Sequence, residues 1–297
     1  MALFSVSSSV SLSTFLDEKG FRTNIAELLS SVDVNNMYTS KNMNQPYRLG
    51  LNNNQIKVVT NECEERKYVY TKFALTELQK SSKAQIVKFR GPYNKHTKAI
   101  VTALHENRHV RSVDFQGPFD KHTIDAVTVL NENRHVMCVG FHGPFNEHTK
   151  HAVTALRENY HVRNVVFQGP FNKHTIDSVT VLHDNSHIYF LVFQGPFNED
   201  TIPAAVNILH KNRHIIKVGF QGPFNKHTIK AVTALTENRY VKMVSFEGPF
   251  NEHTIDAVTA LNENPDVFFV DFYGPYNEDI NESKIRELLP DKNIRCF

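Results

Sequence analysis

Two sets of histidines recur at a fixed interval along this chain, and histidine can serve as a metal ligand or an acid–base group. One set precedes the expected helix in most copies: His96, His122, His148, His174, His227 and His253. The other precedes an expected strand: His109, His135, His161, His187 and His214. A metal ion needs ligands that converge on one point. Histidines repeated in every copy form a row instead, so we expect a structural role and no metal site. Protonating such a row brings like charges together, so we expect stability to fall below about pH 6.

Recurring carboxylates and a lone cysteine are the other candidates for catalysis. Asp125, Asp177 and Asp256 lie beside threonines in what we expect to be the first turn of a helix, where a carboxylate stabilises the helix dipole. We therefore interpret them as capping residues. Cys138 is the only cysteine in the ordinary copies, and no unique base lies near it in the sequence to activate it as a nucleophile.

The segment Gly-Pro-Phe, which recurs in nearly every copy, does not resemble a phosphate-binding loop. Proline removes an amide donor, and no Gly-Lys-Ser/Thr follows it. No Gly-rich dinucleotide fingerprint occurs either. We therefore predict no catalytic residue, no cofactor and no bound metal, and we expect a protein that is not an enzyme.

The elements that position these residues belong to a repeat. A Gly-Pro pair marks each copy, and its glycines are Gly91, Gly117, Gly143, Gly169, Gly195, Gly222, Gly248 and Gly274. The interval is 26 residues at every step but one, where an extra alanine near Ala204 makes it 27. A fixed period in this range indicates stacked structural repeats.

Each copy contains one expected strand and one expected short helix. In the second full copy, Val110, Val113 and Phe115 are apolar and alternate with polar residues toward the end of the strand. The Gly-Pro pair then ends the strand. Ile124, Val127 and Leu130 form the inner stripe of a helix. Asp120 or Thr123 can cap its start, and Asn133 is suited to a left-handed exit.

One strand and one helix in 26 residues cannot bury both of their faces, so neighbouring copies must stack and join their strands into a parallel sheet. Strands lie about 4.8 Å apart, whereas packed helices need about 8–10 Å. Such a stack must bend toward its strands. We therefore predict an α/β repeat solenoid, a curved horseshoe with parallel strands on the concave face and short helices on the convex face.

The pattern Val110-x-x-Val113-x-Phe115 resembles the L-x-x-L-x-L core of leucine-rich repeats. It returns at Val136/Val139/Phe141, Val162/Val165/Phe167, Ile188/Leu191/Phe193, Ile215/Val218/Phe220, Val241/Val244/Phe246 and Val267/Val270/Phe272. The period and the helix are similar to the ribonuclease-inhibitor-like and cysteine-containing subtypes. The chain departs from the family by placing Pro118 where an asparagine or cysteine ladder is usual. The resemblance implies the horseshoe fold and a role in protein–protein interaction.

The repeats leave a different segment at each end. We assign residues 1–55 to an N-terminal capping or variable segment with a short helix from Phe21 to Leu29. Residues 56–83 form a degenerate first repeat, with a strand from Ile56 to Val59 and a helix from Tyr68 to Lys80. Repeats of about 26 residues occupy 84–279, and residues 280–297 form a C-terminal cap on a helix that carries Ile285.

The composition limits the class of protein. Of the 297 residues, 40% are hydrophobic and 22% charged, and the net charge near +2 gives no electrostatic reason to expect nucleic acid or an anionic membrane as a partner. No segment is apolar enough to span a bilayer, so we expect no membrane insertion. Three unpatterned cysteines favour a reducing compartment such as the cytoplasm. The N-terminal segment lacks the basic leader of a conventional signal peptide.

The outward strand positions vary between copies, unlike the positions that hold the stack. We therefore predict that a protein partner of unknown identity binds there. The predicted partner-binding residues are Arg90, Asp114, Gln116, His142, Asn164, Val166, Gln168, Phe190, Val192, Gln194, Lys217, Gln221, Met243, Phe269 and Tyr273. The group around Val166, Phe190 and Val192 and the pair Phe269 and Tyr273 are expected to be exposed apolar contact sites, unless they pack against a terminal segment.

These observations lead to three functional hypotheses. The first is a non-enzymatic, monomeric scaffold that binds a protein. The second is an adaptor that recruits other machinery through residues 1–55, and the third is an unrecognised enzyme. The near-identical copies and the composition rich in Asn and Lys resemble leucine-rich repeat effectors of intracellular bacteria, which implies virulence-related export into a host cell.

Overall fold

The computed structural model describes residues 47–52, 55–60, 85–91, 93–199, 202–276 and 280–297. Its strands form one eleven-stranded sheet in sequence order. They are β1 (Tyr47–Asn52), β2 (Gln55–Thr60), β3 (Ile86–Arg90), β4 (Ser112–Gln116), β5 (Cys138–His142), β6 (Asn164–Gln168), β7 (Phe190–Gln194), β8 (Lys217–Gln221), β9 (Met243–Glu247), β10 (Phe269–Tyr273) and β11 (Asn293–Cys296). β1 pairs with β2 in antiparallel orientation, and every later neighbour is parallel.

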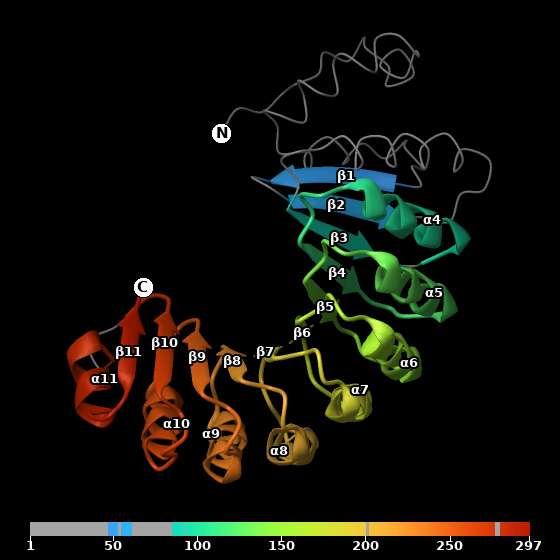
Figure 1. Cartoon of the computed structure of the whole chain (residues 1–297). Coiled ribbons are helices and arrows are strands. Elements are labelled where there is room, and N and C mark those ends of the chain that lie inside the picture. Colours follow the sequence, from blue (N-terminus) through green and yellow to red (C-terminus); the bar gives the residue numbers. More distant parts are fainter. Residues whose placement is uncertain (1–46, 53–54, 61–84, 92, 200–201, 277–279) are drawn as a thin grey trace, which may run out of the picture.

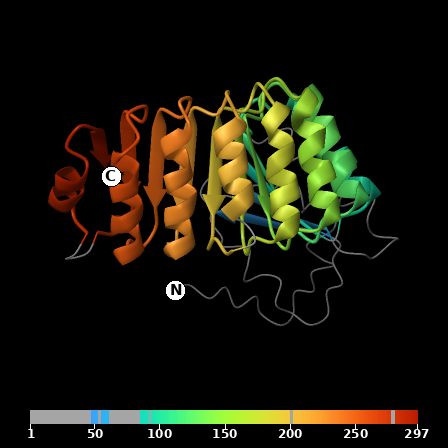
Figure 2. The same cartoon turned by 90° about the horizontal axis from the view of Figure 1, so that it is seen from below.

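The helices lie outside the sheet, on one face of it (Figures 1 and 2). They are α4 (Lys95–Ala103), α5 (Lys121–Val129), α6 (Glu147–Ala155), α7 (Lys173–Thr180), α8 (Ile202–Lys211), α9 (Lys226–Thr233), α10 (Glu252–Asn262) and α11 (Glu282–Leu288). In Figure 1 the strands follow the inner side of an arc and the helices its outer side. The predicted curved α/β solenoid is confirmed. We call each strand with its following helix a coil.

Capping boxes begin most of the helices. In α5 the Asp120 side chain accepts from the backbone N–H groups of His122 and Thr123, and the Thr123 hydroxyl accepts from the Asp120 N–H. The same capping box begins α6, α7, α9 and α10, where the capping residues are Asn146, Asn172, Asn225 and Asn251. The predicted caps at Asp120 and Thr123 are therefore confirmed. Asp125, Asp177 and Asp256 lie beyond the first turn, so their predicted capping role is wrong.

A column of buried asparagines follows the helices, one per coil. Its members are Asn107, Asn133, Asn159, Asn185, Asn212, Asn238 and Asn264. The Oδ1 of Asn159 accepts from the N–H groups of His161 and Val162, at 2.8 and 2.7 Å, and its Nδ2 donates to the Leu130 carbonyl of the preceding coil at 2.7 Å. One prediction is wrong here: the backbone of Asn133 is extended (φ −85°, ψ 118°) and not left-handed. The column lies between each helix and the next strand, and Pro118 still occupies the position after the strand where the leucine-rich repeat ladder is usual.

Phenylalanine rings fill the space between sheet and helices in two columns. The Phe89, Phe115, Phe141 and Phe167 rings stack with centroids 5.5–6.3 Å apart, and those of Phe193, Phe220, Phe246 and Phe272 with centroids 5.4–6.2 Å apart. A second column runs beside them through Phe119 and Phe145, whose centroids are 6.2 Å apart. Because each ring packs on the rings of adjacent coils, the core is continuous from β3 to β11.

The coil of β7 and α8, residues 190–216, has the 27-residue interval and differs from its neighbours. In the other coils the helix tightens at its end, so that the Asn133 N–H, for example, donates to the carbonyl three residues earlier at Leu130. Here α8 remains α-helical, and the Asn212 N–H donates to Ile208, four residues earlier. The extra residue therefore adds to the helix and leaves the strand register unchanged.

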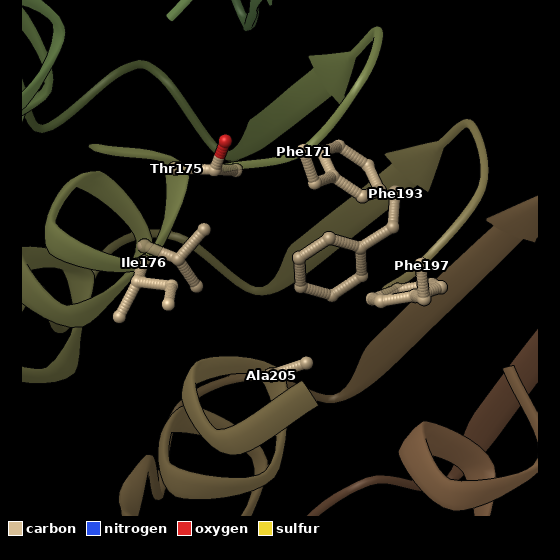
Figure 3. A pocket seen from close by; sticks show the side chains of 7 residues that line it. Phe171, Thr175, Ile176, Phe193, Phe197 and Ala205 are labelled. Atoms are coloured by element: carbon tan, nitrogen blue, oxygen red, sulfur yellow. The ribbon is translucent and has the colours of Figure 1, made fainter. Parts of the chain in front are cut away.

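A small apolar cavity lies where this coil meets the preceding one. Figure 3 shows Phe171, Phe193 and Phe197 on one side of it and Ile176 and Ala205, from α7 and α8, on the other. Its volume of about 10 Å³ is near the minimum for one water molecule. The hydroxyl of Thr175, which also lines it, belongs to the capping box of α7. The cavity is therefore no candidate ligand site.

Some of the elements predicted at the two ends of the sheet are present. β2 confirms the strand predicted from Ile56 to Val59, but β1, within the predicted cap, was not predicted. α11 with buried Ile285 confirms the C-terminal helix, and β11 after it was not predicted either. The helices predicted at Phe21–Leu29 and Tyr68–Lys80 lie outside the described residues.

Candidate binding surface on the concave sheet

Each five-residue strand presents three side chains to the concave face. In β4, Val113 and Phe115 point into the core, and Ser112, Asp114 and Gln116 lie on the opposite face. The parallel register places equivalent residues side by side, so the face consists of three columns. All the predicted partner-binding residues belong to these columns.

The columns differ in exposure. Two of the predicted residues, Arg90 and Phe269, are exposed. Most of the others are half-buried: Gln116, His142, Asn164, Val166, Gln168, Phe190, Gln194, Lys217, Gln221, Met243 and Tyr273. The central column is the most buried: Val192 is 5% exposed, Asp114 8% and Asp271 0%. Side chains from the outer columns and adjacent strands lean over it, and this determines which residues a partner can touch.

Two glycines show how this crowding arises. A Cβ at Gly140 would lie 2.5 Å from Oδ1 of Asp114 and 2.8 Å from Nε2 of His142, so both side chains occupy the space above the glycine. Asp114 also lies 3.7 Å from the Lys88 ammonium and 3.6 Å from His142 Nε2. The buried carboxylate on β4 is therefore flanked by one cation and one imidazole.

Gly219 creates the corresponding space on β8. A Cβ there would lie 3.3 Å from Cγ2 of Val192 and 3.4 Å from the ring of Phe190. The Lys217 ammonium lies 4.8 Å from the centroid of the same ring, in cation–π contact. Our expectation of exposed apolar residues around Val166, Phe190 and Val192 is therefore wrong for Val192, which packs within the face.

Asp271 organises the C-terminal part of the face. The Arg295 guanidinium binds its carboxylate through two hydrogen bonds, Nε to Oδ1 at 2.7 Å and Nη2 to Oδ2 at 2.9 Å. Lys217 reaches the same Oδ2 from two strands away at 3.1 Å. Two cations thus share one fully buried carboxylate, and the cluster carries one surplus positive charge.

Arg295 and Phe297 are functional candidates that our sequence reasoning missed, because β11, which carries Arg295 and ends next to Phe297, was not predicted. The Phe297 ring stacks on Tyr273, with centroids 4.7 Å apart and planes 5° apart. The alternation of Ile294 and Cys296 with polar residues was the available signal, and Ile294 is buried against the core. The last strands thus carry aromatic residues at both of their ends, Phe269 at the start of β10 and the Tyr273–Phe297 stack at its finish.

The chemistry of the face is that of binding. Burial raises the pKa of the Cys138 thiol to about 11, so little of the nucleophilic thiolate exists at neutral pH. Among the residues that the structure describes, no three His, Cys, Asp or Glu side chains are grouped so that they can hold a metal ion. No helix in these parts of the chain has the length and apolar character needed to cross a bilayer.

Comparison with models of protein families finds no match, and comparison with curated proteins finds none either. The structure itself supports a broader classification than our sequence reading. The chain is a repeat protein of strand–helix coils, with a parallel sheet and regularly stacked aromatic rings.

Proposed function

We propose that this chain is a non-catalytic scaffold of the leucine-rich repeat type that holds a protein partner on its concave sheet. One observation carries the proposal: the framework is constant, whereas the inner surface varies. Valine or a similar aliphatic residue, phenylalanine and asparagine occupy the same buried positions from coil to coil. The first concave column instead reads Ser112, Cys138, Asn164, Phe190, Lys217, Met243 and Phe269. A binding scaffold needs this combination of a fixed frame and a particular surface.

The C-terminal half of the face offers the stronger anchors. Phe269 is exposed at the start of β10, and Phe297 stacks on Tyr273 at the other end of that strand, so aromatic surface is available to a partner at both ends. Arg295, half-exposed, lies next to these rings and contributes to the surplus positive charge around Asp271. We infer that the partner presents an apolar side chain next to an acidic one.

The test uses two adjacent phenylalanines that face different surfaces. Phe269 lies on the concave face and is 41% exposed, whereas Phe268 precedes the strand and is 49% exposed. The purified chain and each variant would capture partners from a membrane-free eukaryotic extract, and the affinity of the captured protein would be measured. We expect Phe269→Asp to weaken binding at least about tenfold, as loss of an interface hot spot does. Phe268→Asp should leave binding unchanged, and equal binding by both variants and the parent chain would refute the concave site.

We further propose that the chain acts as a monomer in the cytoplasm, and that it is a virulence effector exported into a host cell. The near-identity of its copies and the free thiols of Cys138 and Cys296 support this proposal. Fusing residues 293–297 to a reporter in a bacterium tests export, and retention of the reporter inside the cell would count against that tail as the signal. An adaptor role would appear as lost recruitment of further proteins after deletion of residues 1–46, which leaves β1 in place.

A further inference from the structure

Exposed apolar residues gather on one edge of the solenoid, away from the concave face. We call this edge the rim. It consists of the connections that lead from each helix into the next strand, at residues 108–111, 134–137, 160–163, 186–189, 213–216, 239–242 and 265–268. Of the eight large hydrophobic residues exposed in the described parts of the chain, six belong to the rim: Met137, Tyr160, Tyr189, Ile216, Tyr240 and Phe268. Because all these strands are parallel, the connections meet at the same edge of the sheet.

The last residue of each connection is aligned with its neighbours by backbone hydrogen bonds. The Met137 N–H donates to the Arg111 carbonyl at 2.8 Å, and the Arg163 N–H donates to the Met137 carbonyl at 2.9 Å. The same bond continues along the edge, so the residues form one row: Arg111, Met137, Arg163, Tyr189, Ile216, Lys242 and Phe268. At the spacing of adjacent strands, about 5 Å, cationic and apolar side chains are thus interleaved along the rim.

The rim carries an excess of positive charge. Its cations are Arg108, Arg111, Arg134, Arg163, Arg213, Arg239 and Lys242. Its one carboxylate, Asp266, pairs with Lys242 at 2.8 Å. The nearest acidic residues, such as Glu132 and Glu237, lie one step back at the helix ends, and His105 and His210 approach them at 4.0 and 3.4 Å. Within the rim itself the cations therefore outnumber the carboxylates, although the whole chain is nearly neutral.

The titration of a rim histidine reflects the same excess. Partial burial lowers the pKa of the His135 imidazole, and so do its positive neighbours. In order of effect these are Arg111, Arg108, His161 and Arg134. The opposite edge, formed by the Gly-Pro turns, differs from the rim in its apolar residues. Among the described residues of that edge, no large hydrophobic side chain is exposed.

We propose that the rim docks this protein on the surface of a lipid bilayer that contains anionic lipids. Arginine and lysine bind anionic headgroups, and tyrosine and phenylalanine favour the membrane–water interface. The coils around α7 to α10 stand side by side with their ends at similar heights in Figure 2, so one edge can meet a flat surface at many points. The aliphatic residues Met137 and Ile216 suit a bilayer and cannot stack on bases, which favours lipid over nucleic acid. Docking of this kind is peripheral and does not insert the chain.

Vesicle flotation of the full chain tests the proposal. The vesicles contain phosphatidylcholine alone or with about one-third phosphatidylserine, at about 0.1 M salt. We expect binding to the anionic vesicles only. Ile216→Asp combined with Phe268→Asp should reduce that binding at least about tenfold, because it removes apolar contacts and adds repulsion. Arg111→Gln combined with Arg163→Gln should reduce it roughly fivefold per charge removed.

Two control variants carry the same changes of charge at other surfaces. Phe269→Asp with Phe297→Asp alters the concave face, and Lys121→Gln with Lys150→Gln alters exposed lysines of the helices. Both should float like the parent chain, and circular dichroism would show that every variant is folded. Equal binding to neutral vesicles, or equal loss in rim and control variants, would overturn the proposal. So would tighter binding of single-stranded RNA than of anionic vesicles, or a dimer that the rim variants dissociate in the absence of lipid.

Discussion

The concave face and the rim are both built from variable positions of the same repeat, but they treat charge in opposite ways. On the concave face each central carboxylate has partners within the sheet: Asp271 binds Arg295 and Lys217, and Asp114 lies near Lys88. On the rim, cations lie among other cations and histidines, and the Asp266–Lys242 pair is the exception. From this difference we expect the inner charges to stabilise the surface that holds them, and the outer ones to contribute little to folding and to be available to an outside ligand.

Loss of the Asp271 carboxylate should have the largest effect. Asp271→Ala leaves the Arg295 and Lys217 charges close together without their shared partner. We expect the free energy of unfolding to fall by about 2–3 kcal/mol, less than for a fully buried pair because Arg295 is half-exposed. Urea denaturation measures it. A loss under about 0.5 kcal/mol would mean that the cluster does not stabilise the face.

The corresponding change on β4 should have a smaller effect. Asp114 approaches Lys88 and His142 only at 3.7 and 3.6 Å, beyond good hydrogen-bond distance. Asp114→Ala is therefore expected to cost about 1 kcal/mol in the same urea experiment. If it cost more than Asp271→Ala, the two carboxylates would not rank by the closeness of their cations.

Lowering the pH should weaken the fold through the rim. The pKa of His135 in the folded chain lies below its ordinary value of 6.5, so the unfolded chain takes up the proton first as the pH falls. Stability is complete above about pH 6.5 and declines as the pH drops below it. We expect a lower Tm at about pH 5.5 than at about pH 7.5, and a shallower dependence for His135→Asn. A constant Tm over this interval would refute both this mechanism and the expected pH sensitivity of the histidine columns.

The smallest change in stability is expected from a rim cation. Arg134→Gln removes one of the positive neighbours that lower the pKa of His135, so that pKa should rise, as measured by NMR titration. Stability should stay within about 0.5 kcal/mol of the parent chain, because no carboxylate of the rim pairs with Arg134. A large loss of stability would show that the rim charges are structural after all.

The architecture was predictable from the sequence because several local signals agree. Alternating Val113 and Phe115, the Gly-Pro stop and the 26-residue interval all require the same strand in each copy. The asparagine column was not predictable from the sequence. The Asn159 side chain accepts from the Val162 N–H in its own coil and donates to the Leu130 carbonyl in the coil before it. Only the stacked structure brings the carbonyl of the preceding coil within hydrogen-bond distance of the asparagine.

The candidate surfaces were predictable to a lesser degree. Sequence spacing identified the three concave columns, but the burial of Val192 and Asp114 depends on which neighbours lean over Gly219 and Gly140. The burial of a side chain on this face is therefore determined by residues one strand away. The rim was missed because net charge was considered for the whole chain, whereas the excess lies on one edge.

The asparagine column also gives the array a polarity along its length. Every Nδ2 bond to a leucine carbonyl runs from a later coil to an earlier one, as from Asn185 to Leu156 and from Asn212 to Leu182. Removing the coils that follow a given coil frees a leucine carbonyl oxygen, whereas removing the coils that precede it frees an asparagine Nδ2 donor, and either group then faces water at the new end. The two ends of a shortened array would therefore offer different groups to water, hydrogen-bond acceptors at the C-terminal end and donors at the N-terminal end.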